Sequence, residues 1–308
     1  MNEHKDTKGI DITATFASLA ALLFWSIGPI FIEYLTGYLD VWTQNFLRYL
    51  AACLFLLPVL ILSIRKNTFE KSLWRKAAGP ACANLAMQTL MTMAFYYIDP
   101  PLLVMLMKSS VIWTAFFSLI FFLDERPLAR SRRFWLGMIF SIIGVTGVMY
   151  YKADLTAART LTGVILALAC GFMFAVYAIS AKVAFKNVDS RRAFSVISIY
   201  TTGGLAILAF LFGDVEKSLH LGAWQWSCVI ISAITAIALG HTFYYAAMRR
   251  IGATIPALIV LAQPFLVLAF AYIVFDKSLN LPQIFSGIIL LTGSALAIWA
   301  QKHLNKSG

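Results

Sequence analysis

The sequence predicts an all-α integral membrane protein with ten transmembrane helices in two inverted five-helix repeats. Of its 308 residues, 60% are apolar and only 13% are charged, whereas a soluble domain is typically about 45–50% apolar and about 25% charged. The apolar residues gather in ten stretches, each close to the ~20 residues that a helix needs to cross ~30 Å of hydrocarbon. Related motifs recur about 150 residues apart, which indicates an internal duplication.

The ten stretches follow one another with short polar connections, which leave no room for a separate domain outside the membrane. The first five expected spans cover residues 14–33, 43–64, 77–98, 101–123 and 134–151. The second five cover residues 161–181, 193–212, 224–248, 253–275 and 281–300. The polar N-terminal segment lacks the apolar core and cleavage site of a secretory signal, so we expect the first span to direct insertion.

The positive charges predict how the chain is oriented in the membrane. Nineteen Lys and Arg residues fall on the side of the N-terminus, four fall on the opposite side, and Arg48 and Lys108 lie within spans. Because Lys and Arg concentrate in cytoplasmic loops, both termini are expected in the cytoplasm and the protein in the inner (plasma) membrane. The net charge of +11 is therefore a topology signal, and no nucleic-acid partner is expected.

Three pairs of motifs support the duplication. "AFYYIDPP" near the end of the third span matches "TFYYAAMRR" in the eighth, and "FFLDERP" after the fourth matches "IVFDKSL" after the ninth. Gly137 and Gly287 occupy similar places in the fifth and tenth spans. Each repeat (residues 14–151 and 161–300) has an odd number of spans, so the second repeat enters the membrane from the opposite side. Inverted repeats of this kind are typical of secondary transporters, whose sites lie near the bilayer midplane.

These features resemble the drug/metabolite transporter superfamily, and more narrowly its EamA-type members. Matching stretches are "FWSIGPIF" in the first span, "TQNFLRY" in the second and "LAQPFLVLAFAYIVFDK" in the ninth. The resemblance covers nearly the whole chain and implies a ten-helix transporter with an alternating central cavity. One departure is the fourth span, which reads "SSVIWT" where the family often has a proline, and this loosens the expected symmetry between the fourth and ninth helices.

The ionisable residues embedded in the spans are basic. All fourteen Asp and Glu residues lie away from the middle of a span, which disfavours proton-coupled efflux of organic cations because such exporters use a buried carboxylate. Lys108 carries the sharpest hypothesis, since a lysine at a helix centre costs about 2.5–3.5 kcal/mol on insertion scales. Its role is open among three: a cavity-facing contact for an anionic substrate group, a stem that snorkels to the interface, and a structural ion pair or bond to the carbonyls of a broken helix.

Two other embedded groups have functional and structural interpretations. Arg48 is expected at a depth similar to that of Lys108, where it binds an anion, caps the first helix, or pairs with Glu33 or Asp40. His241 is suited to proton coupling at neutral pH or to substrate binding, but a lone histidine in a span also serves as a helix–helix hydrogen bond.

Aromatic and amide side chains complete the expected substrate site. Trp25 and Trp113 lie inside their spans, away from the interface, and are interpreted as an aromatic cavity wall or as packing. Gln263, Tyr96 and Tyr177 are candidates for orienting a substrate, with Tyr97, Tyr244, Asn84 and Gln88 as further polar groups.

Prolines and small residues predict local helix geometry. Pro256 and Pro264 are expected to interrupt the ninth helix and free carbonyls. The stripe Gly137, Ser141 and Gly144 predicts close helix packing.

Transport is thus the function that the sequence favours. The expected substrate is a small metabolite with a carboxylate, best an amino acid or a related compound, moved outward by alternating access. A carrier for phosphorylated metabolites, a lipid flippase and a channel remain alternatives. An embedded enzyme is disfavoured because no nucleophile–base pair, histidine cluster or metal-ligand motif appears. We expect no cofactor or metal, and a lipid-embedded monomer or homodimer whose partner is the small-molecule substrate.

Overall fold

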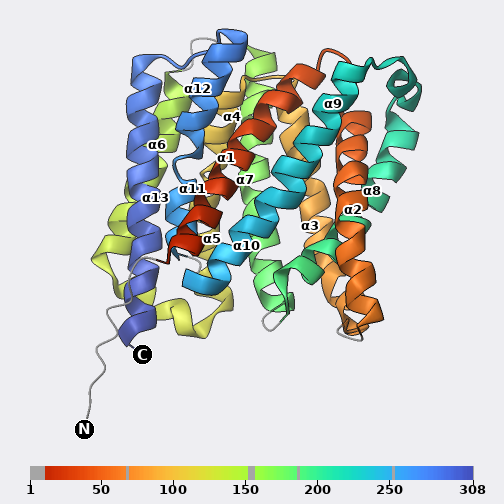
Figure 1. The fold of residues 1–308 in the computed structure, drawn as a ribbon. Coiled ribbons are helices and arrows are strands. Elements are labelled where there is room, and N and C mark those ends of the chain that lie inside the picture. The colour runs from red at the N-terminus through yellow and green to blue at the C-terminus, as the bar shows by residue number, and fades with distance from the viewer. Residues whose placement is uncertain (1–10, 67–68, 152–156, 186–187, 252–253, 308) are drawn as a thin grey trace.

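A bundle of membrane-length helices forms the molecule, as a computed structural model shows (Figure 1). The structure describes residues 11–66, 69–151, 157–185, 188–251 and 254–307. In these segments the regular elements are helices, without a strand. This confirms the all-α class predicted by the sequence.

The first repeat contains six α-helices because its fourth span is divided. They are α1 (Ile12–Leu35), α2 (Val41–Arg65), α3 (Ser72–Phe95), α4 (Pro100–Met107), α5 (Ser110–Phe121) and α6 (Arg132–Tyr150), with a 3-10 helix, η1 (Leu123–Arg130), before α6. Asp11, Asp40 and Ser131 begin α1, α2 and α6 by accepting backbone N–H groups, which satisfies donors that a helix start leaves free.

The second repeat has its eighth and ninth spans divided. Its elements are α7 (Ala158–Ala184), α8 (Ser190–Phe212), η2 (Val215–His220), α9 (Ala223–Ser232), the π-helix η3 (Ala233–Leu239), α10 (Gly240–Ile251), α11 (Thr254–Val260), α12 (Gln263–Phe275) and α13 (Leu281–Ser307). A π-helical turn inside an α-helix is rare and frequently marks a functional site.

Nine helical segments among the described residues are long and apolar enough to cross a membrane. The tenth expected span is α3, whose 24 residues match the others in length. Its composition is more polar, because Asn84, Gln88 and Thr92 follow one another at four-residue spacing on one face and are buried. The polar face points into the protein, so the ten-span architecture holds.

The two repeats interlock. In the bundle α1 packs along α10, α2 along α8, α3 along α7, α4 along α12 and α6 along α13, so the extensive contacts pair one repeat with the other (Figure 1). We call the end at which α1 begins and α13 ends the terminal face, and the opposite end the far face.

The α6–α13 pair depends on the small-residue stripe. A Cβ at Gly137 would lie 2.6 Å from the backbone nitrogen of Ala297, and one at Gly144 would clash with the backbone of Leu290. The hydroxyls of Ser141 and Ser294 lie 3.4 Å apart across the interface. The expectation that this stripe serves helix packing is confirmed, because only small residues allow the two backbones to approach this closely.

Candidate functional site

The fourth span is interrupted at Lys108 and Ser109 without a proline. Around the interruption the backbone hydrogen bonds join residues three apart instead of four, from Lys108 N to Met105 O (3.1 Å) and from Ile112 N to Ser109 O (2.9 Å). The chain thereby turns between α4 and α5 inside the bundle and places Lys108 at the break. The missing proline predicted a looser symmetry between the fourth and ninth helices; in the structure both of these spans are divided into two helices.

The ninth span is interrupted at Leu261 and Ala262, and Pro264 supplies the reason. In a continuous helix the Val260 carbonyl would accept the N–H of residue 264, but proline has no N–H. Val260 O is therefore free for another donor. Pro256 lies in the first turn of α11, where a missing N–H is tolerated; the expectation that it also interrupts the helix is wrong.

Lys108 joins the two breaks. Its Nζ donates to Gln263 Oε1 at 2.9 Å and makes a longer contact to Val260 O at 3.4 Å. In this conformation the amine points to the centre of the bundle, which differs from snorkelling to the interface. An ammonium has three N–H donors, and these two acceptors are both neutral. Among the described residues no carboxylate forms an ion pair with Lys108.

Gln263 connects Lys108 to the first helix. Its Nε2 donates to the backbone oxygen of Trp25 at 2.8 Å, so one amide links α12, α4 and α1. Residue Trp25 is available as an acceptor because Pro29, four residues later, has no N–H. Two prolines thus free the two main-chain oxygens that Lys108 and Gln263 bind.

An aromatic cluster surrounds the Trp25 side chain. Its ring lies 5.2 Å from that of His241 and 4.8 Å from that of Tyr244, measured between centroids. His241 follows the π-helix and stacks on Phe194 of α8 at 4.3 Å. Gly240 allows the approach, since a Cβ there would lie 2.5 Å from Trp25 Nε1.

His241 makes a different hydrogen bond from the one anticipated. Its Nδ1 lies 2.8 Å from Ile237 O of η3, which belongs to the same transmembrane span rather than to a neighbouring one. The ring contacts join α10 to α1 and α8 instead. His241 is thus placed by aromatic packing beside Trp25, whose backbone oxygen binds Gln263.

Arg48 belongs to another network. It is only 1% exposed, and its Nε donates to Ser232 Oγ at 3.1 Å, where α9 meets η3. Neither acid expected as its partner is bound to it: Glu33 pairs with Lys277, and Asp40 caps α2. Its Nη1 is buried without a hydrogen-bond partner. The acceptors of the two cations differ: Ser232 Oγ binds Arg48, whereas Gln263 Oε1 and Val260 O bind Lys108.

Tyr96 and Tyr177 lie away from Lys108 in the hydrogen-bond pattern. The Tyr96 hydroxyl donates to Leu39 O at 2.6 Å and lies 3.0 Å from Gln44 Oε1, which ties the end of α3 to the α1–α2 connection. The Tyr177 and Tyr245 hydroxyls are 3.1 Å apart. Tyr177 therefore borders the aromatic cluster through Tyr245, whereas Tyr96 stabilises the far face.

A charged cluster lies at the far face. Lys277 pairs with Glu33 at the end of α1 and lies 2.8 Å from Asp99 Oδ1, just before α4. Asp276 has a left-handed backbone (φ 54°), which ends α12 and turns Lys277 toward these acids. At the terminal face Arg250 pairs with Asp11 at 2.9 Å. Each pair joins one repeat to the other.

Comparison with known proteins identifies the architecture. The model of the EamA-like transporter family matches residues 12–150 and again residues 161–299. The chain belongs to the EamA-like transporter family. It is accordingly a multi-pass membrane transporter of the drug/metabolite type, and members of this family are transporters rather than enzymes.

The solved structures support the fold of this EamA-like transporter. One of them, entitled only "Crystal structure of protein", is similar with a TM-score of 0.65 and 16% sequence identity. The alignment covers 92% of this chain and 96% of that one. At this identity the similarity shows the fold alone. No curated protein matches the chain.

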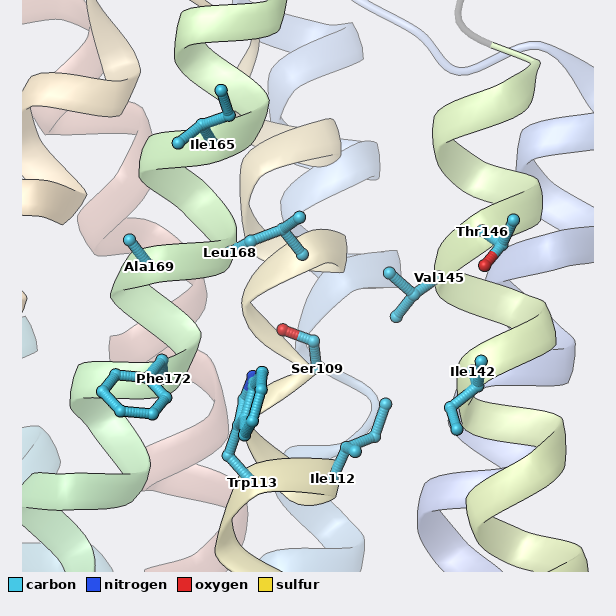
Figure 2. Close-up of a pocket in the computed structure, with 10 residues that line it drawn as sticks. All are labelled: Ser109, Ile112, Trp113, Ile142, Val145, Thr146, Ile165, Leu168, Ala169 and Phe172. Carbon is cyan, nitrogen blue, oxygen red and sulfur yellow. The ribbon is translucent and has the colours of Figure 1, made fainter.

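Trp113 of the EamA-like transporter lies outside the aromatic cluster of Trp25, His241 and Tyr244. It is 38% exposed and lines a cavity of about 480 Å³ bounded by α6, α7 and the α4–α5 break (Figure 2). Its ring meets that of Phe172 edge-on at 5.2 Å. The structure thus separates the two tryptophans that the sequence grouped as one aromatic wall.

Some hydrogen-bonding groups that the sequence analysis did not name could have been predicted from nearby prolines. The Val260 carbonyl follows from Pro264 by four-residue spacing, and the Trp25 carbonyl follows from Pro29 in the same way. Ser232, the partner of Arg48, and Phe194, the partner of His241, carry no signal, because an isolated serine or phenylalanine in an apolar span is ordinary.

Proposed function

We propose that this transporter is a secondary carrier for a small metabolite with a carboxylate, best an amino acid or a related compound. The observation that carries the proposal is the environment of Lys108. The cation lies at the meeting point of two broken helices, with neutral oxygens of Gln263 and Val260 as partners and a third donor for an incoming anion. A charge in this environment is costly to bury, and an anionic substrate group offsets that cost.

The neighbouring groups suit such a substrate. Gln263 orients the ammonium and also binds the backbone oxygen of Trp25. The Trp25–His241–Tyr244 cluster thus offers an apolar and aromatic surface tied to the same amide. Broken helices at the interface of inverted repeats bind substrates in other secondary transporters, because freed backbone groups line the cavity there. A phosphorylated metabolite is the second candidate, because phosphate uses the same cation.

Alternating access is part of the proposal. The Lys277–Glu33–Asp99 cluster closes the far face, and the Arg250–Asp11 pair bridges the repeats at the terminal face. We infer that these contacts break in turn as the cavity opens to each side. The excess of Lys and Arg on the terminal side supports a plasma-membrane carrier with cytoplasmic termini, and export is the proposed direction.

A counterflow assay in liposomes tests the substrate class. Purified protein is reconstituted with a panel of carboxylates, phosphates, neutral compounds and cations, and saturable exchange is measured. Saturable exchange of carboxylates supports the carrier, whereas non-saturable flux supports a channel and scrambling of labelled phospholipid supports a flippase. Exchange confined to neutral and cationic compounds would exclude an anion-binding role for Lys108.

Variants of Lys108 separate charge from structure. Lys108→Met retains an unbranched side chain without charge, and Lys108→Arg retains the charge. A hydrogen bond to a charged group contributes about 1.5–3 kcal/mol, so we expect Lys108→Met to lower carboxylate affinity by about tenfold or more. Lys217→Met, which removes an exposed lysine of η2, is the matched control. Unchanged affinity in a folded Lys108→Met protein would leave Lys108 only the structural role of joining the breaks.

A further inference from the structure

A lateral groove adjoins the α4–α5 break and is lined by neither Gln263 nor Val260, the residues that bind Lys108. Its walls are α6, with Ile142 and Thr146, and α7, with Ile165 and Phe172, and its floor is the start of α5 with Trp113 (Figure 2). The volume of about 480 Å³ lies in the range of cavities that hold a small ligand. The lining is apolar except for two hydroxyl residues, and it carries no charged residue.

The depth of the groove decides which molecules reach it. Ile165 is seven residues into α7, and Phe172 is seven residues further, which places the groove about 10 to 20 Å along a helix of 27 residues. Thr146 and Ile142 are similarly inside α6. The central part of a membrane-spanning helix lies in the hydrocarbon layer, about 30 Å thick. Because Ile142 and Ile165 at its rim are exposed, the groove opens sideways into this layer, so the acyl chains of the bilayer reach it directly.

The shape and composition of the rim favour a lipid over a second copy of the chain. Helices associate in membranes through small residues that let backbones approach. The small-residue face of α6 is already covered by α13, and the exposed rim of the groove carries the large residues Ile142 and Ile165. Ile142 is 51% exposed and Ile165 is 57% exposed, so the rim faces the lipid side of the bundle.

We propose that the groove binds one acyl chain of a phospholipid, which packs over the α4–α5 break. A chain in the groove contacts apolar side chains on three sides, whereas a lipid on a convex helix surface contacts one. Dispersion contacts are individually small and add up with their number. The bound chain is therefore retained longer than the surrounding lipids, and it supports the turn that carries Lys108.

Retention of phospholipid after detergent exchange tests the site. Native mass spectrometry counts phospholipid on the full chain for wild type, for Ala169→Trp, which fills the groove from α7, and for Ile207→Trp. Ile207 is 62% exposed on α8, outside the groove, so it is the matched control. We expect one retained phospholipid on wild type and Ile207→Trp, and at least tenfold lower occupancy on Ala169→Trp. Gel filtration and thermal unfolding check that all three fold, and Thr146→Phe replaces Ala169→Trp if that variant fails.

Fluorescence identifies the part of the lipid that occupies the groove. Phospholipids brominated along one acyl chain are added in nanodiscs, and the quenching of wild type is compared with that of Trp113→Phe. In wild type we expect part of the quenching to come from Trp113 and to be lost in Trp113→Phe. We expect this part to be lost also in Thr146→Phe, which fills the groove without adding an indole. Equal lipid retention in the filled and control variants overturns the proposal, as does a wild-type dimer that Ala169→Trp dissociates without loss of lipid, since the occupant would then be a second copy.

Discussion

Lys108 Nζ and Gln263 Oε1 lie 2.9 Å apart and connect the broken fourth span of one repeat to the broken ninth span of the other. Both helices are interrupted at nearly equivalent places, and the lysine reaches from the first interruption to the second. A cation that is costly to place in the membrane thereby lies where two helices are interrupted and a backbone oxygen is left without its helical partner. The predictions that follow test this arrangement and the contacts around it.

The charge state of position 263 is expected to control anion binding. Gln263→Glu places a carboxylate at the position of the present Lys108 acceptor and neutralises the cation, whereas Gln263→Met removes the acceptor and leaves the charge. Both variants lose the bond to Trp25 O, so their difference reports the carboxylate placed beside Lys108. We expect carboxylate affinity to fall at least tenfold further in Gln263→Glu, measured by counterflow. Equal losses in the two variants would contradict an anion-binding Lys108.

Removal of Lys277 is expected to open the far face. Lys277→Met leaves Glu33 and Asp99 without their shared cation, and like charges then repel. Spin labels at Tyr38 and Leu281, both exposed near the far face, report the opening by pulsed electron resonance. We expect the longer-distance population to increase severalfold in Lys277→Met, with wild-type distances retained in Lys277→Arg and in Lys217→Met. A distance distribution unchanged by Lys277→Met would show that the cluster is not a gate.

Ser232 is expected to stabilise the protein through Arg48. Ser232→Ala leaves Arg48 Nε buried without its acceptor, and an unsatisfied buried group costs about 1–3 kcal/mol. We expect a lower free energy of unfolding for the detergent-solubilised protein. Ser227→Ala on the same helix is the control, because that hydroxyl is exposed and bonds only to its own helix. Similar stability of the two variants would mean that Ser232 does not support Arg48.

The α6–α13 interface is expected to reject even one methyl group. Gly144→Ala places a Cβ against the Leu290 backbone, whereas Gly79→Ala on α3 meets no atom within 4 Å. Overpacking typically costs about 1–3 kcal/mol, and alanine in an open helical position stabilises by roughly 0.5–1 kcal/mol relative to glycine. Thermal unfolding should therefore show opposite shifts for the two variants. A stabilising effect of Gly144→Ala would refute the close packing.

Asp40 is expected to make stability depend on acidic pH. Burial alone would raise the pKa of this carboxyl, but N–H groups of Asp214, Thr43 and Trp42 bind it and hold the pKa below its ordinary value of 3.8. A lowered pKa in the folded state means that the stabilisation is complete above the ordinary value and is lost as pH falls through the folded-state pKa. Asp40→Asn should flatten this acidic loss, measured by thermal unfolding from neutral pH to about pH 3. An unchanged pH profile would assign the loss to other carboxyls.

The sequence alone predicted the architecture because the lipid acts on each span separately. Ten apolar stretches predicted ten crossings, and constant motif spacing predicted two repeats. The prolines also act locally: Pro264 lacks the N–H that Val260 would bind, whatever the rest of the chain does. The stripe Gly137, Ser141 and Gly144 predicted a close helix contact for the same local reason, although it did not name α13 as the partner.

The tertiary structure decided which polar groups meet. Lys108 and Gln263, and likewise Glu33 and Lys277, are far apart in the chain, and their pairing depends on which helices pack together. The structure chose among alternatives that the sequence left open: Arg48 contacts Ser232 rather than an acid, and Trp113 lines a groove without Trp25. The Lys108 amine bonds to Gln263 and to a carbonyl of the broken ninth helix rather than snorkelling to the interface. Apolar pattern determines that a helix enters the membrane, whereas a polar side chain takes its partner from the neighbouring helix that the fold places beside it.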